Sequence, residues 1–185
     1  MTDLERRVAS LEARLASAPG AEPMPGTAPP SQQPPGVSSG VSHTGAAPIA
    51  LRAEEAVLRS GVVNPNYRNG VERYRAGDCE QAMANFRQFI KAEPTSDLAD
   101  NAQYWIGECY YARKDFNRAI IELNEVFTKY PKGDRVPGAL LALATSFADS
   151  GDDIDARLIL QKLINDHPGS EEAEIGRQKL KVLTQ

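Results

Sequence analysis

The hydrophobic and polar positions repeat at a long, fixed interval over the C-terminal two thirds of the chain. Large apolar residues, small residues, acids and prolines each recur at the same interval. The prolines at positions 94, 131 and 168 show that this interval is 37 residues. A period of this length is typical of stacked structural repeats. The columns are Pro94, Pro131 and Pro168; Asp78, Asp115 and Asp152; Ala82, Ala119 and Ala156; Phe86, Leu123 and Leu160; and Phe89, Val126 and Leu163.

Within one repeat these columns predict two helices joined by a tight turn. The small residues Gly70, Gly107 and Ala144 fall midway along the first helix, and the alanine column falls near the start of the second. Small side chains at both places allow the two backbones to approach closely. The aspartate column is placed to cap the second helix after the turn, and the proline column ends that helix.

A single helix pair cannot bury its apolar face, whereas stacked pairs can. The sequence therefore predicts an all-α superhelix of three helix pairs with a concave side. The pairs fall at about residues 64–97, 98–134 and 135–170. A last amphipathic segment, residues 171–183, begins with acids that suit the start of a helix, and we expect it to cap the exposed apolar face.

The first 50 residues follow a different pattern. Residues 1–17 place apolar side chains at heptad spacing, which predicts a short coiled-coil helix for oligomerisation. Two heptads are few, so a surface helix or a frayed tail explains the pattern as well. Residues 18–50 are rich in Pro, Gly and Ser and poor in large apolar side chains, which predicts a disordered linker before the domain at 51–185. The heptad residues are Leu4, Val8, Leu11 and Leu15.

Composition narrows the classes of partner. The net charge is −4 over 185 residues, which argues against nucleic acid because phosphate binding needs a concentrated basic surface. No apolar run is long enough to span a membrane, and the first residues as written hold no secretory signal. Cys79 and Cys109 are too few for a disulfide scaffold or a zinc site. We expect them to be small buried residues, with a disulfide in an oxidising compartment as the alternative.

No group of residues has the spacing of a catalytic or metal site. The two histidines, His43 and His167, stand apart from each other and from the cysteines. The acid pairs Asp152-Asp153 and Glu171-Glu172 fall at helix starts, where capping explains them. We therefore expect no catalytic residue, no metal and no cofactor, and a function in protein binding.

The first helix of each pair is expected to line the concave groove. Four tyrosines face it, and tyrosine suits contact surfaces that are partly wet, while Asn101 and Glu108 can hydrogen-bond a peptide backbone. The alternative is that some of the tyrosines pack between helices; Trp105 is expected on another face, in the core. The predicted protein-binding residues are Tyr67, Tyr74, Asn101, Tyr104, Glu108 and Tyr111, with Val71, Arg75, Leu141, Thr145 and Ala148 along the same line.

The second repeat carries a resemblance to known families. The residues that match the tetratricopeptide pattern at its signature spacing are Gly107, Tyr110, Ala119, Leu123 and Pro131. More narrowly, the run Ala102-Gln103-Tyr104-Trp105-Ile106-Gly107-Glu108, followed by Tyr110-Tyr111, resembles the C-terminal domain of the CpoB/YbgF family. The resemblance covers roughly residues 67–183. The 37-residue period is longer than the usual 34 of tetratricopeptide repeats.

The CpoB/YbgF family belongs to the Tol-Pal system of Gram-negative bacteria. The resemblance implies a periplasmic scaffold that coordinates outer-membrane constriction with septal peptidoglycan synthesis in cell division. It implies an envelope Tol component and the peptidoglycan synthase machinery as partners, and a homotrimer through residues 1–17. The Val and Leu at the heptad positions favour a dimer instead. Family members carry an export signal and a longer coiled coil, so a cytoplasmic tetratricopeptide adaptor remains an alternative. An outer-membrane assembly factor ranks last, because no lipidation cysteine lies near the N-terminus.

Overall fold

The computed structural model describes Arg6 and residues 44–59 and 63–184. The chain divides into two units, residues 1–41 and 42–185, and the fold below is that of the second unit. The predicted coiled-coil residues Leu4, Val8, Leu11 and Leu15, and the predicted linker up to residue 43, lie outside the described residues.

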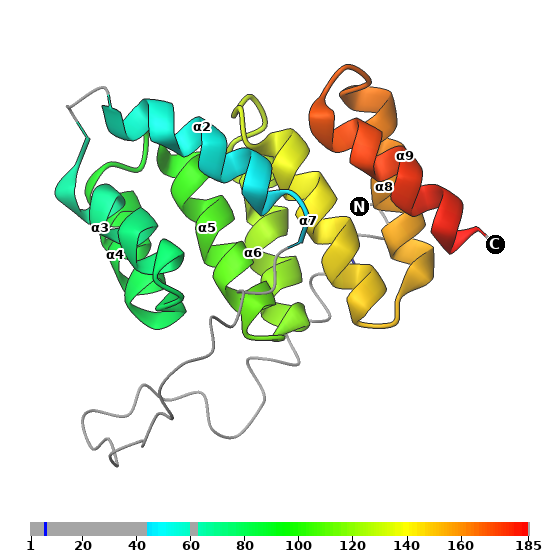
Figure 1. Ribbon diagram of the computed structural model, residues 1–185, viewed down its shortest axis with the longest axis horizontal. Coiled ribbons are helices and arrows are strands. Elements are labelled where there is room, and N and C mark those ends of the chain that lie inside the picture. Colours follow the sequence, from blue (N-terminus) through cyan, green and yellow to red (C-terminus); the bar gives the residue numbers. More distant parts are fainter. Residues whose placement is uncertain (1–5, 7–43, 60–62, 185) are drawn as a thin grey trace, which may run out of the picture. The chain divides into compact units, whose positions relative to one another are not determined.

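Residues 44–59 and 63–184 form helices and connecting turns, with no strand among them (Figure 1). The all-α prediction is confirmed. The first helix of this unit begins at Ala47, inside the stretch predicted as linker. The helices are α2 (Ala47–Arg59), α3 (Pro65–Arg75), α4 (Cys79–Ala92), α5 (Ala99–Ala112), α6 (Phe116–Lys129), α7 (Val136–Asp149), α8 (Asp153–Asp166) and α9 (Glu171–Leu183).

Helices α3 to α8 form three antiparallel pairs that stack in chain order. Each helix contacts the next one, and α3, α5, α7 and α9 also contact one another in succession. These four form the inner layer, and α4, α6 and α8 form the outer one. The close approach within a pair depends on the small residues: a Cβ atom built on Gly70 would lie 2.6 Å from the Phe86 ring, and one on Gly107 would lie 2.5 Å from Leu123.

The turn inside each pair is stabilised by the aspartate column. Each aspartate follows a residue in the left-handed region, at φ 79° for Gly77, 59° for Lys114 and 89° for Gly151. Its side chain then accepts a hydrogen bond from the backbone N–H three residues later, which satisfies a donor that the helix leaves open. The capping pairs are Asp78 with Gln81, Asp115 with Arg118, and Asp152 with Asp155.

Helix α9 covers the apolar face that the third pair leaves open. Ser170 caps it by accepting from the Ala173 N–H, and Ala173 is fully buried. A Cβ on Gly176 would lie 3.2 Å from Leu163 of α8, so α9 rests closely on the last pair. None of the helices described is both long and apolar enough to cross a membrane.

A groove filled by the helix that precedes the repeats

Helix α2 lies along the inner layer of the repeats (Figure 1). It contacts α7, it forms hydrogen bonds with residues of α3 and α5, and its Arg52 forms a 2.7 Å ion pair with Glu171 of α9. The chain's own segment therefore occupies the concave surface on which the partner was expected to bind. The buried side chains of this segment are Thr44, Ala46, Ala47, Ala50 and Glu54.

The Glu54 carboxylate is fully buried and receives hydrogen bonds from all three repeats. The Tyr67 hydroxyl of α3 donates to Oε2 at 2.6 Å. Oε1 accepts from Asn101 Nδ2 at 2.9 Å and from Trp105 Nε1 at 3.2 Å, both on α5. It also accepts from Arg135, just before α7, at 2.8 Å. A buried carboxylate lowers the free energy of unfolding unless it is paired with a cation and fully hydrogen-bonded. Here Arg135 is the cation, and the four donors together provide the hydrogen bonds.

These four donor residues, named here the carboxylate pocket, are held by the core of the repeats. The Tyr67 ring packs edge-on against Phe89 with centroids 5.2 Å apart. The Arg135 backbone N–H donates to Asp100 at 3.1 Å, which fixes the start of α7. Burial, reinforced by the neighbouring Glu54, raises the pKa of Tyr67, so its hydroxyl keeps its proton and remains a donor.

A second buried acid, Glu108 of α5, lies farther along the same groove. Its carboxyl accepts from the Tyr104 hydroxyl at 3.0 Å, from the Tyr74 hydroxyl at 3.5 Å and from the Thr44 hydroxyl. No cation pairs with Glu108 within the part of the chain that the structure describes. Burial therefore raises the pKa of Glu108 to about 7, although the three hydroxyls partly offset that effect.

The far end of the groove, at the third repeat, is open. A cavity of about 340 Å³ lies between α7, α8 and α9. Val182 on its wall is 70% exposed. The Thr145 hydroxyl donates to the Thr44 carbonyl at 3.1 Å, so the cavity begins where the chain enters α2. The lining residues are Ala144, Thr145, Ala148, Asp149, Leu160, Gln178, Lys179, Val182 and Leu183.

Comparison with known families agrees with this architecture. A tetratricopeptide-repeat model matches residues 67–134, and a second model of the same description matches residues 138–170. Together they cover more than half of the chain, and they coincide with the stacked pairs. The chain is a tetratricopeptide-repeat protein. No curated protein matches it. Tetratricopeptide repeats present extended concave surfaces for other proteins, so this one is a scaffold for protein contacts.

In this tetratricopeptide-repeat protein the six predicted groove residues share one surface. Four of their side chains donate to a buried acid on or beside α2, and all six are buried. Their binding of a partner remains a prediction, because α2 contacts the same surface. The residues are Tyr67, Tyr74, Asn101, Tyr104, Glu108 and Tyr111.

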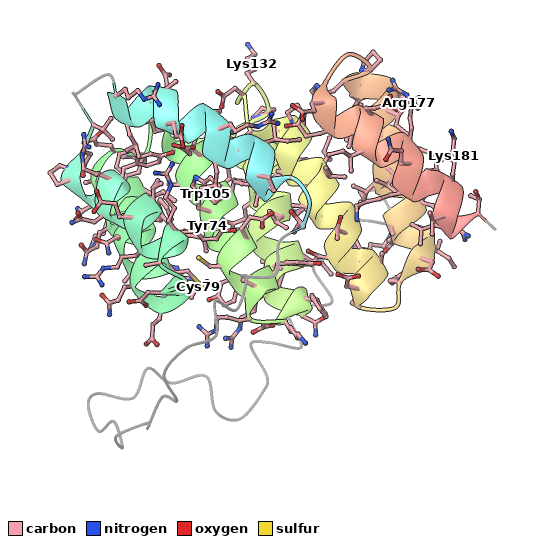
Figure 2. The ribbon with its side chains drawn as sticks, in the orientation of Figure 1. Tyr74, Cys79, Trp105, Lys132, Arg177 and Lys181 are labelled. Atoms are coloured by element: carbon pink, nitrogen blue, oxygen red, sulfur yellow. The ribbon has the colours of Figure 1, made fainter. Side chains whose placement is uncertain are left out.

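The tyrosines combine the two roles weighed from the sequence. Their rings pack between helices. Tyr74 lies beside Trp105 (Figure 2), with ring centroids 4.7 Å apart, and the Tyr104 ring lies 5.0 Å from that of Trp105. Their hydroxyls point to carboxylates on the inner side, and Tyr111, at the open end, donates to Asp149 of α7. Ring and hydroxyl therefore serve the core and the groove at the same time.

Three residues of the groove were missed by reasoning from the sequence. Trp105 was expected in the core, away from the groove; it is fully buried, yet its indole N–H reaches Glu54. Arg135 lies in a turn, so helical periodicity gave no reason to select it. Glu54 belongs to a short amphipathic stretch, where Ala47, Ala50 and Glu54 share one helical face. That shared face was the only available signal.

The two cysteines are buried free thiols, as expected for small core residues. Cys79 begins α4 and Cys109 lies in α5, and the two thiols are close enough to interact with each other. This contact lowers the pKa of Cys79, while the same contact and burial raise the pKa of Cys109. The fold therefore places the only two thiols of the sequence side by side.

Proposed function

We propose that this tetratricopeptide-repeat protein is a non-enzymatic periplasmic scaffold of the Tol-Pal system. In that role it coordinates outer-membrane constriction with septal peptidoglycan synthesis during cell division. Its partners are an envelope Tol component and the peptidoglycan synthase machinery, and residues 1–17 join its copies. The observation that carries the binding role is that the concave face holds a helix, α2, through specific polar contacts from every repeat.

The Tol-Pal assignment draws support from the position of the resembling residues. The run from Ala102 to Glu108 lies on α5, in the middle of the inner layer. It supplies Trp105 to the carboxylate pocket and Glu108 to the second buried acid. The stretch that resembles the CpoB/YbgF family is thus the stretch that forms the groove floor, where a shared mode of binding would require similar residues.

The open cavity offers a partner a first point of contact beside α2. Its wall is mainly apolar, with Asp149 and Lys179 at the rim. An apolar concavity with a few charged groups at its edge suits a protein segment that has one apolar face.

The test is a pull-down from envelope extract with the full chain as bait, read by mass spectrometry. We expect an envelope Tol component and peptidoglycan synthase proteins among the captured partners. Tyr111→Ala, which opens the groove wall beside Asp149, should lower that capture while the helical circular-dichroism signal is kept. Tyr130→Ala is the matched control, because Tyr130 lies in an inter-repeat loop and does not line the open cavity.

Two results would contradict the proposal. One is capture of cytosolic proteins alone, together with recovery of the protein only in cytosol after cell fractionation with the native gene start. The other is equal loss of capture by the Tyr111 and Tyr130 variants, which would mean that the groove is not the binding surface.

A further inference from the structure

Helix α2 is held in the groove by polar groups and small side chains. Its larger apolar residues, Ile49, Leu51, Val57 and Leu58, are only partly buried. Three of its five buried side chains, counted from residue 44, are alanine methyl groups, which contribute little hydrophobic free energy. The attachment therefore depends chiefly on Glu54 and on Thr44. A segment held in this way can be exchanged for another that offers the same groups.

All four residues of the carboxylate pocket belong to the repeats, and none belongs to α2. Its donors come from α3, α5 and the residue that precedes α7. The rings of Tyr67 and Trp105 are held by aromatic packing, and the backbone N–H groups of Asn101 and Arg135 donate to Asp100. Donors that are fixed in advance lose little conformational freedom when they bind a carboxylate. The repeats thus present a set of hydrogen-bond donors to any acidic side chain that reaches the pocket.

The pocket also has hydrogen-bonding capacity that Glu54 does not use. Arg135 Nε is a buried donor with no hydrogen-bond partner among the residues described. A guanidinium group binds a carboxylate best through two parallel N–H donors, whereas Arg135 donates to Glu54 through one terminal nitrogen. A partner's carboxylate is therefore able to engage Arg135 more fully than Glu54 does.

We propose that the carboxylate pocket recognises an acidic side chain on a helix of a partner protein, and that α2 is the internal competitor for this pocket. The inference rests on the proposed function, because it states the chemistry of the segment that the scaffold binds. The partner helix carries Asp or Glu preceded by small residues four and seven positions earlier, as Ala50 and Ala47 precede Glu54. Small residues there let the helix approach α7 closely. Its binding displaces α2.

The test measures binding of a labelled synthetic peptide to the full chain by fluorescence anisotropy. The probe is a peptide of residues 44–59, and a second peptide carries Glu54→Gln. The receptors are the wild-type chain, the chain with Glu54→Gln and the chain with Glu55→Gln. Glu55 is the matched control, because it is exposed and its contacts are ion pairs with Arg59 and Arg75.

The Glu54→Gln chain keeps the pocket but holds its own α2 less firmly. It should bind the wild-type peptide at least tenfold more tightly than the wild-type chain does. The reason is that the peptide's Glu54 forms charge-assisted hydrogen bonds with the pocket, whereas the displaced glutamine side chain of the variant gives up only the weaker ones of an uncharged amide. The Glu55→Gln chain should behave like the wild type. The Glu54→Gln peptide should bind the Glu54→Gln chain at least tenfold more weakly than the wild-type peptide.

Equal binding of the two peptides, or no gain for the Glu54→Gln chain, would overturn the inference. Exchange of α2 between two copies, seen as a dimer of the Glu54→Gln chain in size-exclusion chromatography, would also overturn it. If that chain is not folded by circular dichroism, Arg52→Glu is used in its place, since it breaks the ion pair with Glu171 and leaves the pocket intact. The envelope pull-down tests the proposed function separately. If it captures a Tol component but the two peptides bind equally, this inference alone fails. If the peptides differ as expected but no Tol component is captured, only the Tol-Pal assignment fails.

Discussion

The buried Glu108 should make the stability of the protein fall as the pH rises from about 4.5 to about 7. Burial raises its pKa from the ordinary 4.5 to about 7 in the folded state. Below pH 4.5 the carboxyl is protonated in both states and folding carries no penalty. Between the two values the unfolded chain releases the proton while the folded chain keeps it, so the free energy of unfolding decreases with pH. Above pH 7 the loss is complete and constant.

The size of the effect follows from the shift. A difference of roughly 2.5 pKa units at 1.36 kcal/mol each corresponds to about 3 kcal/mol at pH 8. That is a large fraction of the ~5–15 kcal/mol by which most domains are stable. Glu108→Gln removes the titration but keeps an acceptor for the hydroxyls of Thr44, Tyr74 and Tyr104. The stability of this variant relative to the wild type should therefore improve by about 3 kcal/mol between pH 4.5 and 8.

The assay is urea denaturation at a series of pH values, followed by far-ultraviolet circular dichroism. Glu80→Gln, the same change at an exposed position of α4, controls for the loss of one negative charge. Parallel stability curves for the wild type and Glu108→Gln between pH 5 and 8 would refute the reasoning. They would mean that Glu108 is reached by water, or that it is paired with a cation, in the folded protein.

Three further changes test the repeat itself. Gly107→Ala should lower the free energy of unfolding by about 1–3 kcal/mol, since its Cβ would lie 2.5 Å from Leu123; an unchanged melting temperature would contradict this. Lys114→Gly should stabilise by about 1 kcal/mol in urea denaturation, because Lys114 holds the left-handed φ of 59° that glycine adopts freely; a loss of stability would show that the side chain matters more than the turn. Oxidation with diamide should lower the free-thiol count from two to none by joining Cys79 to Cys109 within one chain. An unchanged count, or dimers on a non-reducing gel, would contradict that prediction.

The repeat was predictable because each of its rules acts over a short distance in the sequence. The aspartate caps act on the N–H three residues later, and the glycine at the centre of α3 meets Phe86 only 16 positions on (from 70 to 86). Such pairings recur in every repeat, so the pattern of residues carries them three times. The order of the helices and the positions of the turns between them could therefore be predicted from local rules.

The occupant of the groove was not predictable in the same way. Glu54 and Glu55 are adjacent acids on one helix, and in the sequence they differ only in that Glu54 shares a helical face with Ala47 and Ala50. The fold separates them: Glu54 is buried against Arg135, 81 positions away, while Glu55 forms only exposed ion pairs. The residues that bind Glu54 are brought together by the stacking of the three repeats, and no local sequence pattern predicts that arrangement.

The two buried acids of the groove are stabilised in different ways, and both contact the segment of residues 44–59. Glu54 brings its charge to a cation and three further donors supplied by the repeats. Glu108 belongs to the repeats and accepts hydrogen bonds from three hydroxyls, one of them supplied by Thr44. A helix that replaces α2 must therefore bring an acid to the first position and a hydroxyl or similar donor to the second. The sequence of the displaced segment, from Thr44 to Glu54, is accordingly the best available description of what the groove selects.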